Sequence, residues 1–162
     1  MKTKSLATSC ILLSVGFILH AIVPGIGTMK PDFLLAMMIL AIVINPVFSM
    51  AMSIAFVASI LSALTTVFPG GQILSFLDKF GSAIVIYLLF QFLKSKTYSI
   101  VLVSAVGTFI SGIIFILGAM FISGMDTSLL SLIGIVVIPT TILNTILIKF
   151  VYERVLTRLK IV

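Results

Sequence analysis

Two segments that follow runs of proline and glycine each carry one cation beside one anion. Lys30 and Asp32 flank Pro31, and Asp78 is followed directly by Lys79. A lysine ammonium binds a carboxylate, and an aspartate carboxylate binds an ammonium, through charge-assisted hydrogen bonds. These residue types therefore predict a site for a small molecule that carries both charges, a zwitterion.

Uncharged polar side chains and aromatic rings accompany the charged pairs. The rings expected around these segments are those of Phe17, Phe33, Phe68, Phe76 and Phe80. A zwitterion with an aromatic side chain suits this mixture of charged, polar and apolar groups. The candidate substrate-binding residues are therefore His20, Lys30, Asp32, Thr66, Gln72, Asp78, Lys79 and Asn144.

Each candidate also has a simpler explanation, and the sequence leaves both open. The charged pairs can be solvated groups at the membrane surface that only neutralise the outer loops. His20 can be a packed, hydrogen-bonded residue, and Asn144 can bond a neighbouring helix. The phenylalanines can belong to the core or face lipid.

Motifs that would indicate catalysis or nucleotide binding do not occur in the sequence. It contains no Gly-x-x-x-x-Gly-Lys-Ser/Thr phosphate loop, no His-Glu-x-x-His zinc motif and no Gly-x-Ser-x-Gly nucleophile turn. Cys10 is the single cysteine, which excludes an intrachain disulfide and a thiolate metal cluster. The sequence therefore predicts neither an enzyme nor a bound cofactor or metal.

The elements that must position these residues are predicted to be membrane helices. The chain is 61% hydrophobic and 9% charged, and its mean hydropathy is +1.41, whereas charged residues make up about a quarter of a soluble domain. Because a spanning helix needs about 20 apolar residues, the sequence predicts an all-α domain, residues 1–162, with six transmembrane helices. The predicted helices are residues 5–23, 33–44, 47–68, 74–93, 98–122 and 129–151.

Two of the predicted helices are irregular. The stretch 33–44 is short for a hydrocarbon core of about 30 Å. The loop before it must therefore dip into the membrane or be covered by protein. Pro139 is expected to kink the last helix.

The cations lie on alternate connections between the helices. One set comprises Lys2, Lys4, Lys94, Lys96, Lys149, Arg154, Arg158 and Lys160, and the other only Lys30 and Lys79. The positive-inside rule then places the N- and C-termini in the cytoplasm. Asp32, Asp78 and Asp126 are expected at the outer helix ends, so the chain is not expected to power uptake through an acid at mid-membrane depth.

Small residues recur at four-residue spacing on two predicted helices. They are Ala51, Ala55, Ser59 and Ala63 on one helix, and Ser104, Thr108 and Gly112 on another, with Gly107 and Ser111 alongside. This spacing lets helix backbones approach closely, so we expect packing within the bundle. Ser5 and Ser9 form a weaker pair near the cytoplasmic end of the first helix, which we expect to face a partner.

Several segments together resemble a known family. They are His20-Ala-Ile-Val-Pro24, Met29-Lys30-Pro31-Asp32, Ser62-Ala-Leu-Thr65-Thr66-Val-Phe68-Pro69-Gly-Gly-Gln72-Ile73, Asp78-Lys79 and Leu143-Asn144-Thr145. Through them the chain resembles the TrpP-type tryptophan transporters of Gram-positive bacteria over nearly its whole length. That family is similar to the substrate-binding S-components of energy-coupling-factor (ECF) transporters.

The resemblance implies a six-helix subunit of the bacterial cell membrane that captures tryptophan from outside. Delivery would require association with a transmembrane T-component and two ATPases. Many S-components carry an Ala-x-x-x-Ala docking pair on the first helix, where this chain has Ser5-x-x-x-Ser9.

Within such a site, the substrate carboxylate would bind Lys30 or Lys79, and its ammonium would bind the aspartate of either charged pair. The indole N–H would meet Asn144 or Gln72. Two alternatives stay open. One is a solitary secondary carrier or facilitator, and the other is an S-component for another aromatic or vitamin-like molecule.

Overall fold

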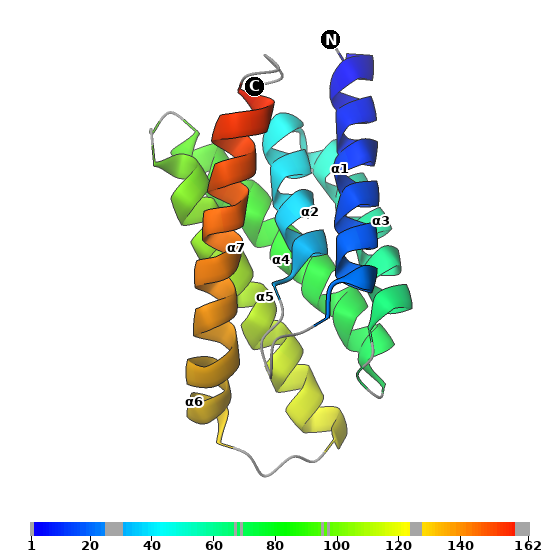
Figure 1. Ribbon diagram of the computed structural model, residues 1–162, viewed down its shortest axis with the longest axis vertical. Coiled ribbons are helices and arrows are strands. Elements are labelled where there is room, and N and C mark those ends of the chain that lie inside the picture. Colours follow the sequence, from blue (N-terminus) through cyan, green and yellow to red (C-terminus); the bar gives the residue numbers. More distant parts are fainter. Residues whose placement is uncertain are drawn as a thin grey trace.

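Five long apolar helices and a shorter one form the part of the chain that the structure describes. The computed structural model describes residues 2–24, 31–66, 68, 70–94, 96, 98–123 and 128–157. The helices run side by side along the long axis of the molecule (Figure 1). They are α1 (Lys2–Ile22), α2 (Phe33–Ile44), α3 (Phe48–Thr65), α4 (Gly71–Leu93), α5 (Ser99–Ser123) and a last rod of α6 (Leu129–Leu132), the π-helix η1 (Ile133–Val137), α7 (Ile138–Val151) and the π-helix η2 (Tyr152–Leu156).

The lengths of these helices confirm the predicted membrane bundle. α1, α3, α4, α5 and the last rod are each apolar and at least 18 residues long, enough to cross a membrane. α2, with 12 residues, is the shorter helix. The all-α fold with six transmembrane helices predicted from the sequence is therefore confirmed.

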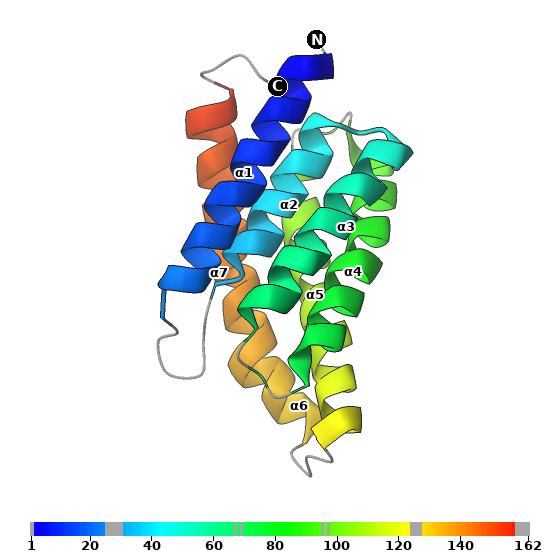
Figure 2. The same cartoon turned by 90° about the vertical axis from the view of Figure 1, so that its right-hand side faces the viewer.

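The short helix α2 lies in the middle of the bundle. It contacts α1, α3, α4, α5 and α7, and every residue from Leu34 to Val43 is buried. Figure 2 shows it between α1 and α3, with α7 and α5 behind. A helix enclosed by protein need not match the thickness of the bilayer, because its ends do not meet lipid. Protein also covers the start of this short helix, where Asp32 directly precedes α2 and is largely buried.

Small residues allow close packing of the neighbouring helices. Ala51, Ala55 and Ser59 are fully buried on α3. On α5, a Cβ atom at Gly107 would lie 2.6 Å from Cγ1 of Ile86 on α4. A larger side chain does not fit there unless Ile86 shifts, which agrees with the close packing that the small-residue pattern predicted.

Ser5 and Ser9 contribute to the contact between α1 and α2. The buried amide of Asn45, at the C-terminal end of α2, donates to Ser9 Oγ at 2.7 Å and to the Ser5 carbonyl oxygen at 3.3 Å. The Ser9 hydroxyl in turn donates to the Ser5 carbonyl oxygen at 3.0 Å. A buried amide needs hydrogen-bond acceptors, and the Ser9 hydroxyl is one of those that Asn45 uses. The Ser9 side chain therefore faces α2 of the same chain. The docking role expected for the Ser5–Ser9 pair stays a prediction.

The irregularity expected at Pro139 takes the form of a π-helical turn. The N–H of Ile138 donates to the carbonyl oxygen of Ile133, five residues earlier. Proline lacks an N–H, and its ring clashes with the carbonyl four residues before it in an α-helix. The wider turn η1 comes directly before this proline. Such turns inside helices are frequent at functional sites.

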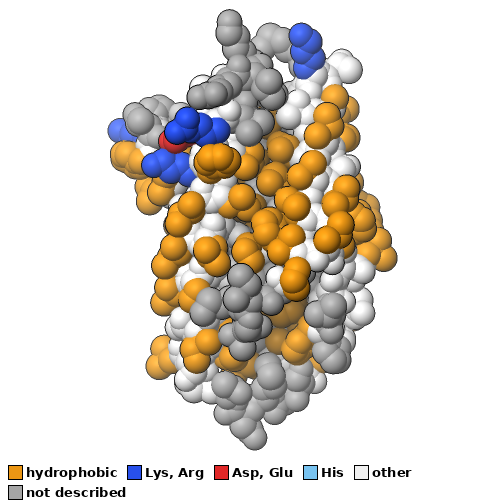
Figure 3. Space-filling view, viewed as in Figure 1, with side chains coloured by type: hydrophobic (Ala, Val, Ile, Leu, Met, Phe, Trp, Pro, Cys, Tyr) orange, Lys and Arg blue, Asp and Glu red, His pale blue; other side chains and the backbone are white. Residues whose placement is uncertain are grey.

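Both ends of the described chain lie at one end of the bundle. The start of α1 and the end of η2 both lie there (Figure 1). On the face shown in Figure 3, the visible lysine and arginine side chains gather at this same end, and apolar side chains cover the region below. A shared end for the two termini agrees with an even number of crossings. The cytoplasmic orientation of that end stays a prediction from the charge count.

Candidate functional site

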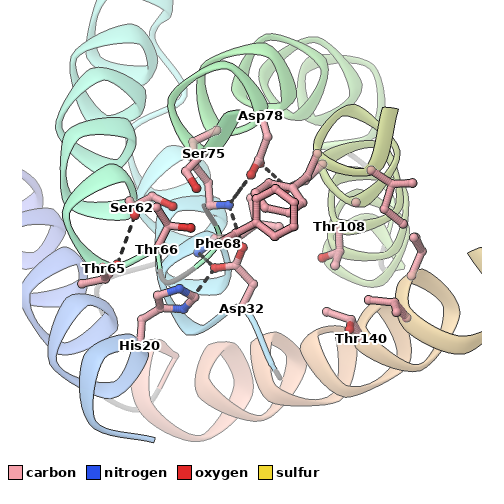
Figure 4. Close-up of a pocket in the computed structure, with 18 residues that line it drawn as sticks. His20, Asp32, Ser62, Thr65, Thr66, Phe68, Ser75, Asp78, Thr108 and Thr140 are labelled. Atoms are coloured by element: carbon pink, nitrogen blue, oxygen red, sulfur yellow. Dashed lines mark hydrogen bonds and ion pairs between the residues drawn. The ribbon is translucent and has the colours of Figure 1, made fainter. Parts of the chain in front are cut away.

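A cavity of about 370 Å³ lies inside the bundle. Eighteen described residues line it, and they come from every helical rod and from the segment between α3 and α4. Figure 4 shows the labelled side chains arranged around it. Charged groups occupy one part of the wall, and apolar and hydroxyl groups occupy the rest.

Three charged side chains form the polar part of this wall. Lys79 Nζ lies 2.6 Å from Asp32 Oδ2. The same ammonium donates to both oxygens of Asp78, at 3.0 and 2.9 Å. Lys79 and Asp78 are each only 2% exposed. The simpler explanation left open by the sequence, that these charges are solvated at the surface, is therefore wrong for this pair. We refer to Asp32, Asp78 and Lys79 as the charged triad.

Asp32 is held in place from three directions. Its carboxylate caps α2 by accepting a hydrogen bond from the Leu35 amide at 3.0 Å, in the manner of N-cap residues. The Asn144 amide on α7 donates to the Asp32 carbonyl oxygen at 3.2 Å. His20 Nδ1, near the end of α1, lies 3.6 Å from Asp32 Oδ1. Burial alone raises the pKa of this carboxyl, but the charges of Lys79 and His20 outweigh it and lower the pKa to about 2.

Asp78 lies deeper in the bundle than the sequence predicted. α4 begins at Gly71 instead of residue 74. Asp78 therefore lies two helical turns into α4, about 10 Å along the axis from its start. It accepts a hydrogen bond from the Ser111 hydroxyl on α5. The expectation that this acid sits at an outer helix end is therefore wrong. The signal for the earlier start was the glycine pair at the start of α4, where Gly70 adopts φ +72°, a conformation that favours glycine.

When His20, 3.6 Å from Asp32, is neutral, the charged triad carries one excess negative charge. Two carboxylates share the single Lys79 ammonium. Buried charges are stable only when opposite charges and hydrogen bonds surround them. A cationic group of a ligand can pair with Asp32, the most exposed member of the triad.

Apolar groups form the other part of the cavity. Phe68 and Phe115 meet edge to face with ring centroids 5.8 Å apart, a favourable aromatic arrangement. Val136 and Val137 of η1 line the wall nearby. Close approach of α5 to η1 depends on Gly112, where a Cβ atom would lie 2.8 Å from Val137 Cγ1.

The structure brings together most of the residues predicted from the sequence. His20, Asp32, Thr66, Asp78 and Lys79 all line the cavity. Lys30 lies outside the described residues. Two further candidates, Gln72 and Asn144, do not belong to the lining.

Gln72 and Asn144 differ in what the structure assigns to them. Gln72 is exposed on the first turn of α4. Asn144 is buried and bonds the backbone of Asp32, which matches its simpler explanation as a link between helices. Asn144 therefore helps to position Asp32 through the Asp32 backbone and does not line the cavity itself.

Several hydroxyl groups of the lining were missed as site residues. They are those of Ser62, Ser75, Thr108, Ser111 and Thr140. Thr108 and Ser111 belong to the small-residue pattern that predicted helix packing on α5. A small hydroxyl residue serves packing and polar contact equally well, so the spacing alone did not separate the two roles. Of the five phenylalanines named from the sequence, Phe68 lines the cavity.

Metal binding finds no support in the described part of the chain. No group of three or more His, Cys, Asp or Glu side chains there is arranged to hold a metal ion. The triad has two carboxylates, but the Lys79 ammonium lies between them. The site chemistry is that of ion pairing and hydrogen bonding.

Comparison with known proteins gives matches over the whole chain. The family model described as "Tryptophan transporter TrpP" matches residues 2–160. A "Probable tryptophan transport protein" of Bacillus subtilis (strain 168) is 40% identical over 99% of this chain and 95% of its own length. Proteins of the same description from Clostridium acetobutylicum and Clostridium perfringens are 33% and 32% identical, and cover 100% and 95% of this chain and 97% and 92% of their own lengths. No solved structure matches the chain.

Proposed function

This chain belongs to the TrpP family of tryptophan transporters, and we propose that it binds tryptophan in the cavity beside the charged triad. The family and the apolar helices make it a multi-pass protein of the bacterial membrane. The cavity volume of about 370 Å³ falls within the range of small-molecule sites, roughly 300–1,000 Å³. Its mixture of charges and aromatic rings suits an aromatic zwitterion.

In the proposed complex, the charged end of tryptophan inserts between Asp32 and Lys79. The substrate ammonium binds the Asp32 carboxylate, and the substrate carboxylate binds the Lys79 ammonium. Lys79 keeps Asp78 as its second partner. Every buried charge then retains an opposite charge beside it, which is necessary because an unpaired buried charge is costly.

The observation that carries this proposal is the Asp32–Lys79 ion pair in the cavity wall, 2.6 Å between Nζ and Oδ2. An existing pair of opposite charges supplies both contacts that a zwitterion needs. With His20 neutral, the excess negative charge of the triad favours approach of the ammonium. The indole would occupy the region bounded by Phe68, Phe115 and Val137, which excludes water from the ring.

A thermal-stability panel tests the choice of substrate. The purified chain is heated with L-tryptophan, other amino acids, riboflavin, biotin or thiamine. A ligand that binds only the folded state stabilises it by about 2.7 kcal/mol at one hundred times its Kd. We expect stabilisation by tryptophan and none by the vitamins. A shift with a vitamin and none with tryptophan would reject the assignment.

For energy coupling, we propose association with an ECF-type T-component and two ATPases. The sequence lacks a phosphate-binding loop of its own, and the resemblance to S-components supports this arrangement. Reconstitution in vesicles tests it: uptake should require the added T-component, the ATPases and ATP. Capture would take place from outside, with the termini cytoplasmic.

A solitary secondary carrier is the second candidate, and one observation favours it. Asp78 is buried two turns inside a membrane-spanning helix, and ion-coupled carriers use acids in such positions. Uptake by vesicles that contain this chain alone, driven by an ion gradient, would support this candidate and reject the ECF proposal.

A further inference from the structure

Thr108 is the one described residue of the cavity lining whose hydroxyl oxygen is buried and has no hydrogen-bond partner; Thr141 and Thr145 on α7 share that property but do not line the cavity. Thr108 lies on α5, lines the cavity and is 2% exposed. Its Oγ1 atom has no hydrogen-bond partner among the described residues. Hydroxyls in helices usually donate to a carbonyl oxygen of the preceding turn, as Ser59 does to Ala55 at 2.7 Å. Ser111, one turn further along α5, donates to Asp78.

A buried hydroxyl without a partner is unfavourable, by an amount comparable to a lost hydrogen bond. Natural structures keep such groups where a ligand or a functional contact uses them. Thr108 lines the cavity, and its hydroxyl oxygen is covered in this structure, so a ligand reaches that oxygen after a small shift of the side chains that cover it. The position therefore points to a polar contact with the bound substrate.

Thr108 and the charged triad lie in different parts of the cavity wall (Figure 4). Thr108 precedes Ser111 by three residues, about 4.5 Å along the axis of α5, and Ser111 bonds the Asp78 carboxylate. In Figure 4, Thr108 lies across the cavity from His20 and Thr65, with Asp32 between the two sides and Thr140 near Thr108. A molecule with its charged end at Asp32 can thus extend its side chain toward Thr108.

We propose that Thr108 Oγ accepts a hydrogen bond from the indole N–H of tryptophan and selects tryptophan over phenylalanine. This inference rests on the proposed function. Tryptophan carries an N–H donor on its ring, and this donor normally finds a partner when buried. Phenylalanine has no such group and would leave the Thr108 hydroxyl without a partner. A site built to bond a polar group discriminates against ligands that lack it.

The two acceptors suggested by the sequence are less suitable for this contact. The Asn144 amide nitrogen donates to the Asp32 backbone, and its Oδ1 atom also lacks a described hydrogen-bond partner, but Asn144 is not part of the cavity wall. Gln72 is exposed. Thr108 combines burial, an unused acceptor and contact with the cavity.

Two ligands and three variants test the inference. The ligands are L-tryptophan and 3-benzothienylalanine, in which sulfur replaces the indole N–H at nearly the same size. The variants are Thr108→Val, which removes the hydroxyl but keeps the branched shape, Thr108→Ser, which keeps a hydroxyl, and the matched control Thr141→Val. Thr141 also carries a buried hydroxyl without a described partner, but it does not line the cavity.

We expect the wild-type chain to bind tryptophan about 10-fold more tightly than the sulfur analogue, the ratio expected for one hydrogen bond. Thr108→Val should bind tryptophan about 10-fold more weakly and the analogue unchanged, so that the preference disappears. Thr108→Ser should keep the preference, and Thr141→Val should behave as wild type. Without ligand, Thr108→Val should melt at the same or a higher temperature, because it lacks the unpaired hydroxyl.

Two results would overturn the inference while leaving the proposed function intact. One is a Thr108→Val chain that retains the preference for tryptophan. The other is an equal loss of affinity for both ligands, which would assign Thr108 a structural role. A wild-type chain that binds neither ligand would instead reject the proposed function, and this inference with it.

Discussion

Lys79 Nζ lies 2.6 Å from Asp32 Oδ2, and this ion pair connects the interior of α4 to the residue that caps α2. The same two side chains line the cavity. The pair therefore has a structural role, because it joins α2 to α4. It also has a proposed functional role, because a zwitterion can insert into it.

The substitution Asp32→Asn removes the proposed partner of the substrate ammonium. Asparagine keeps the size of the side chain and can still cap α2, and Lys79 retains Asp78. We therefore expect a folded chain whose affinity for tryptophan falls at least about 10-fold, as for loss of a hydrogen bond to a charged group. Calorimetric titration measures this. The control Glu153→Gln changes an exposed acid far from the cavity and should bind normally; equal binding by both variants would remove Asp32 from the site.

The substitution Lys79→Met leaves two buried carboxylates without their shared cation. Breaking a buried ion pair by removal of one partner costs about 3–5 kcal/mol, so we expect a large fall in melting temperature. The double variant Asp78→Asn/Lys79→Met should recover part of this loss, because only Asp32 then lacks its partner. A single variant as stable as wild type would contradict the structural role of the triad.

The substitution Asn144→Ala tests whether Asn144 positions Asp32 through the Asp32 backbone. It removes the hydrogen bond to the Asp32 carbonyl oxygen, which is expected to contribute about 0.5–1.5 kcal/mol. Affinity for tryptophan should fall roughly 2- to 10-fold by the same principle, less than for Asp32→Asn. Gln72→Ala, at an exposed residue outside the cavity wall, is the control. If both variants bind alike, Asn144 does not position the site.

The substitution Gly112→Ala tests the close contact of α5 with the π-helical turn η1. The added Cβ atom would meet Val137 at 2.8 Å, so one of the two elements must move. We expect lower stability and weaker tryptophan binding, because both elements line the cavity. Gly134→Ala is the matched control, since no atom lies within 4 Å of a Cβ there. Comparable melting temperatures for the two variants would argue against this contact.

The helices of the bundle could be predicted because each apolar run consists of residues that are adjacent in the sequence. Each spanning helix must supply its own apolar run, so all six helices were evident in the sequence. Their ends were less certain: α4 starts three residues early, at Gly71. That shift alone moved Asp78 from a helix end into the interior.

The charged triad could not be predicted in full because its contacts join distant segments. The sequence identified Asp32, Asp78 and Lys79 separately, as members of two charged pairs. It did not show that one ammonium bonds both aspartates, since this depends on how α2 and α4 pack. Thr108 and Ser9 illustrate the same limit, because spacing on a helix does not reveal whether a small polar residue faces a cavity, a neighbouring helix or a partner.

The most direct test of the central proposal uses the fluorescence of the ligand itself. The chain contains no tryptophan, so indole emission excited at the red edge of absorption reports the bound ligand without protein background. Titrations would compare L-tryptophan with tryptamine, which lacks the carboxylate, and indole-3-propionate, which lacks the ammonium. If tryptophan inserts between Asp32 and Lys79, it should bind at least about 10-fold more tightly than either analogue. Equal binding of tryptophan and one of the analogues would contradict the insertion.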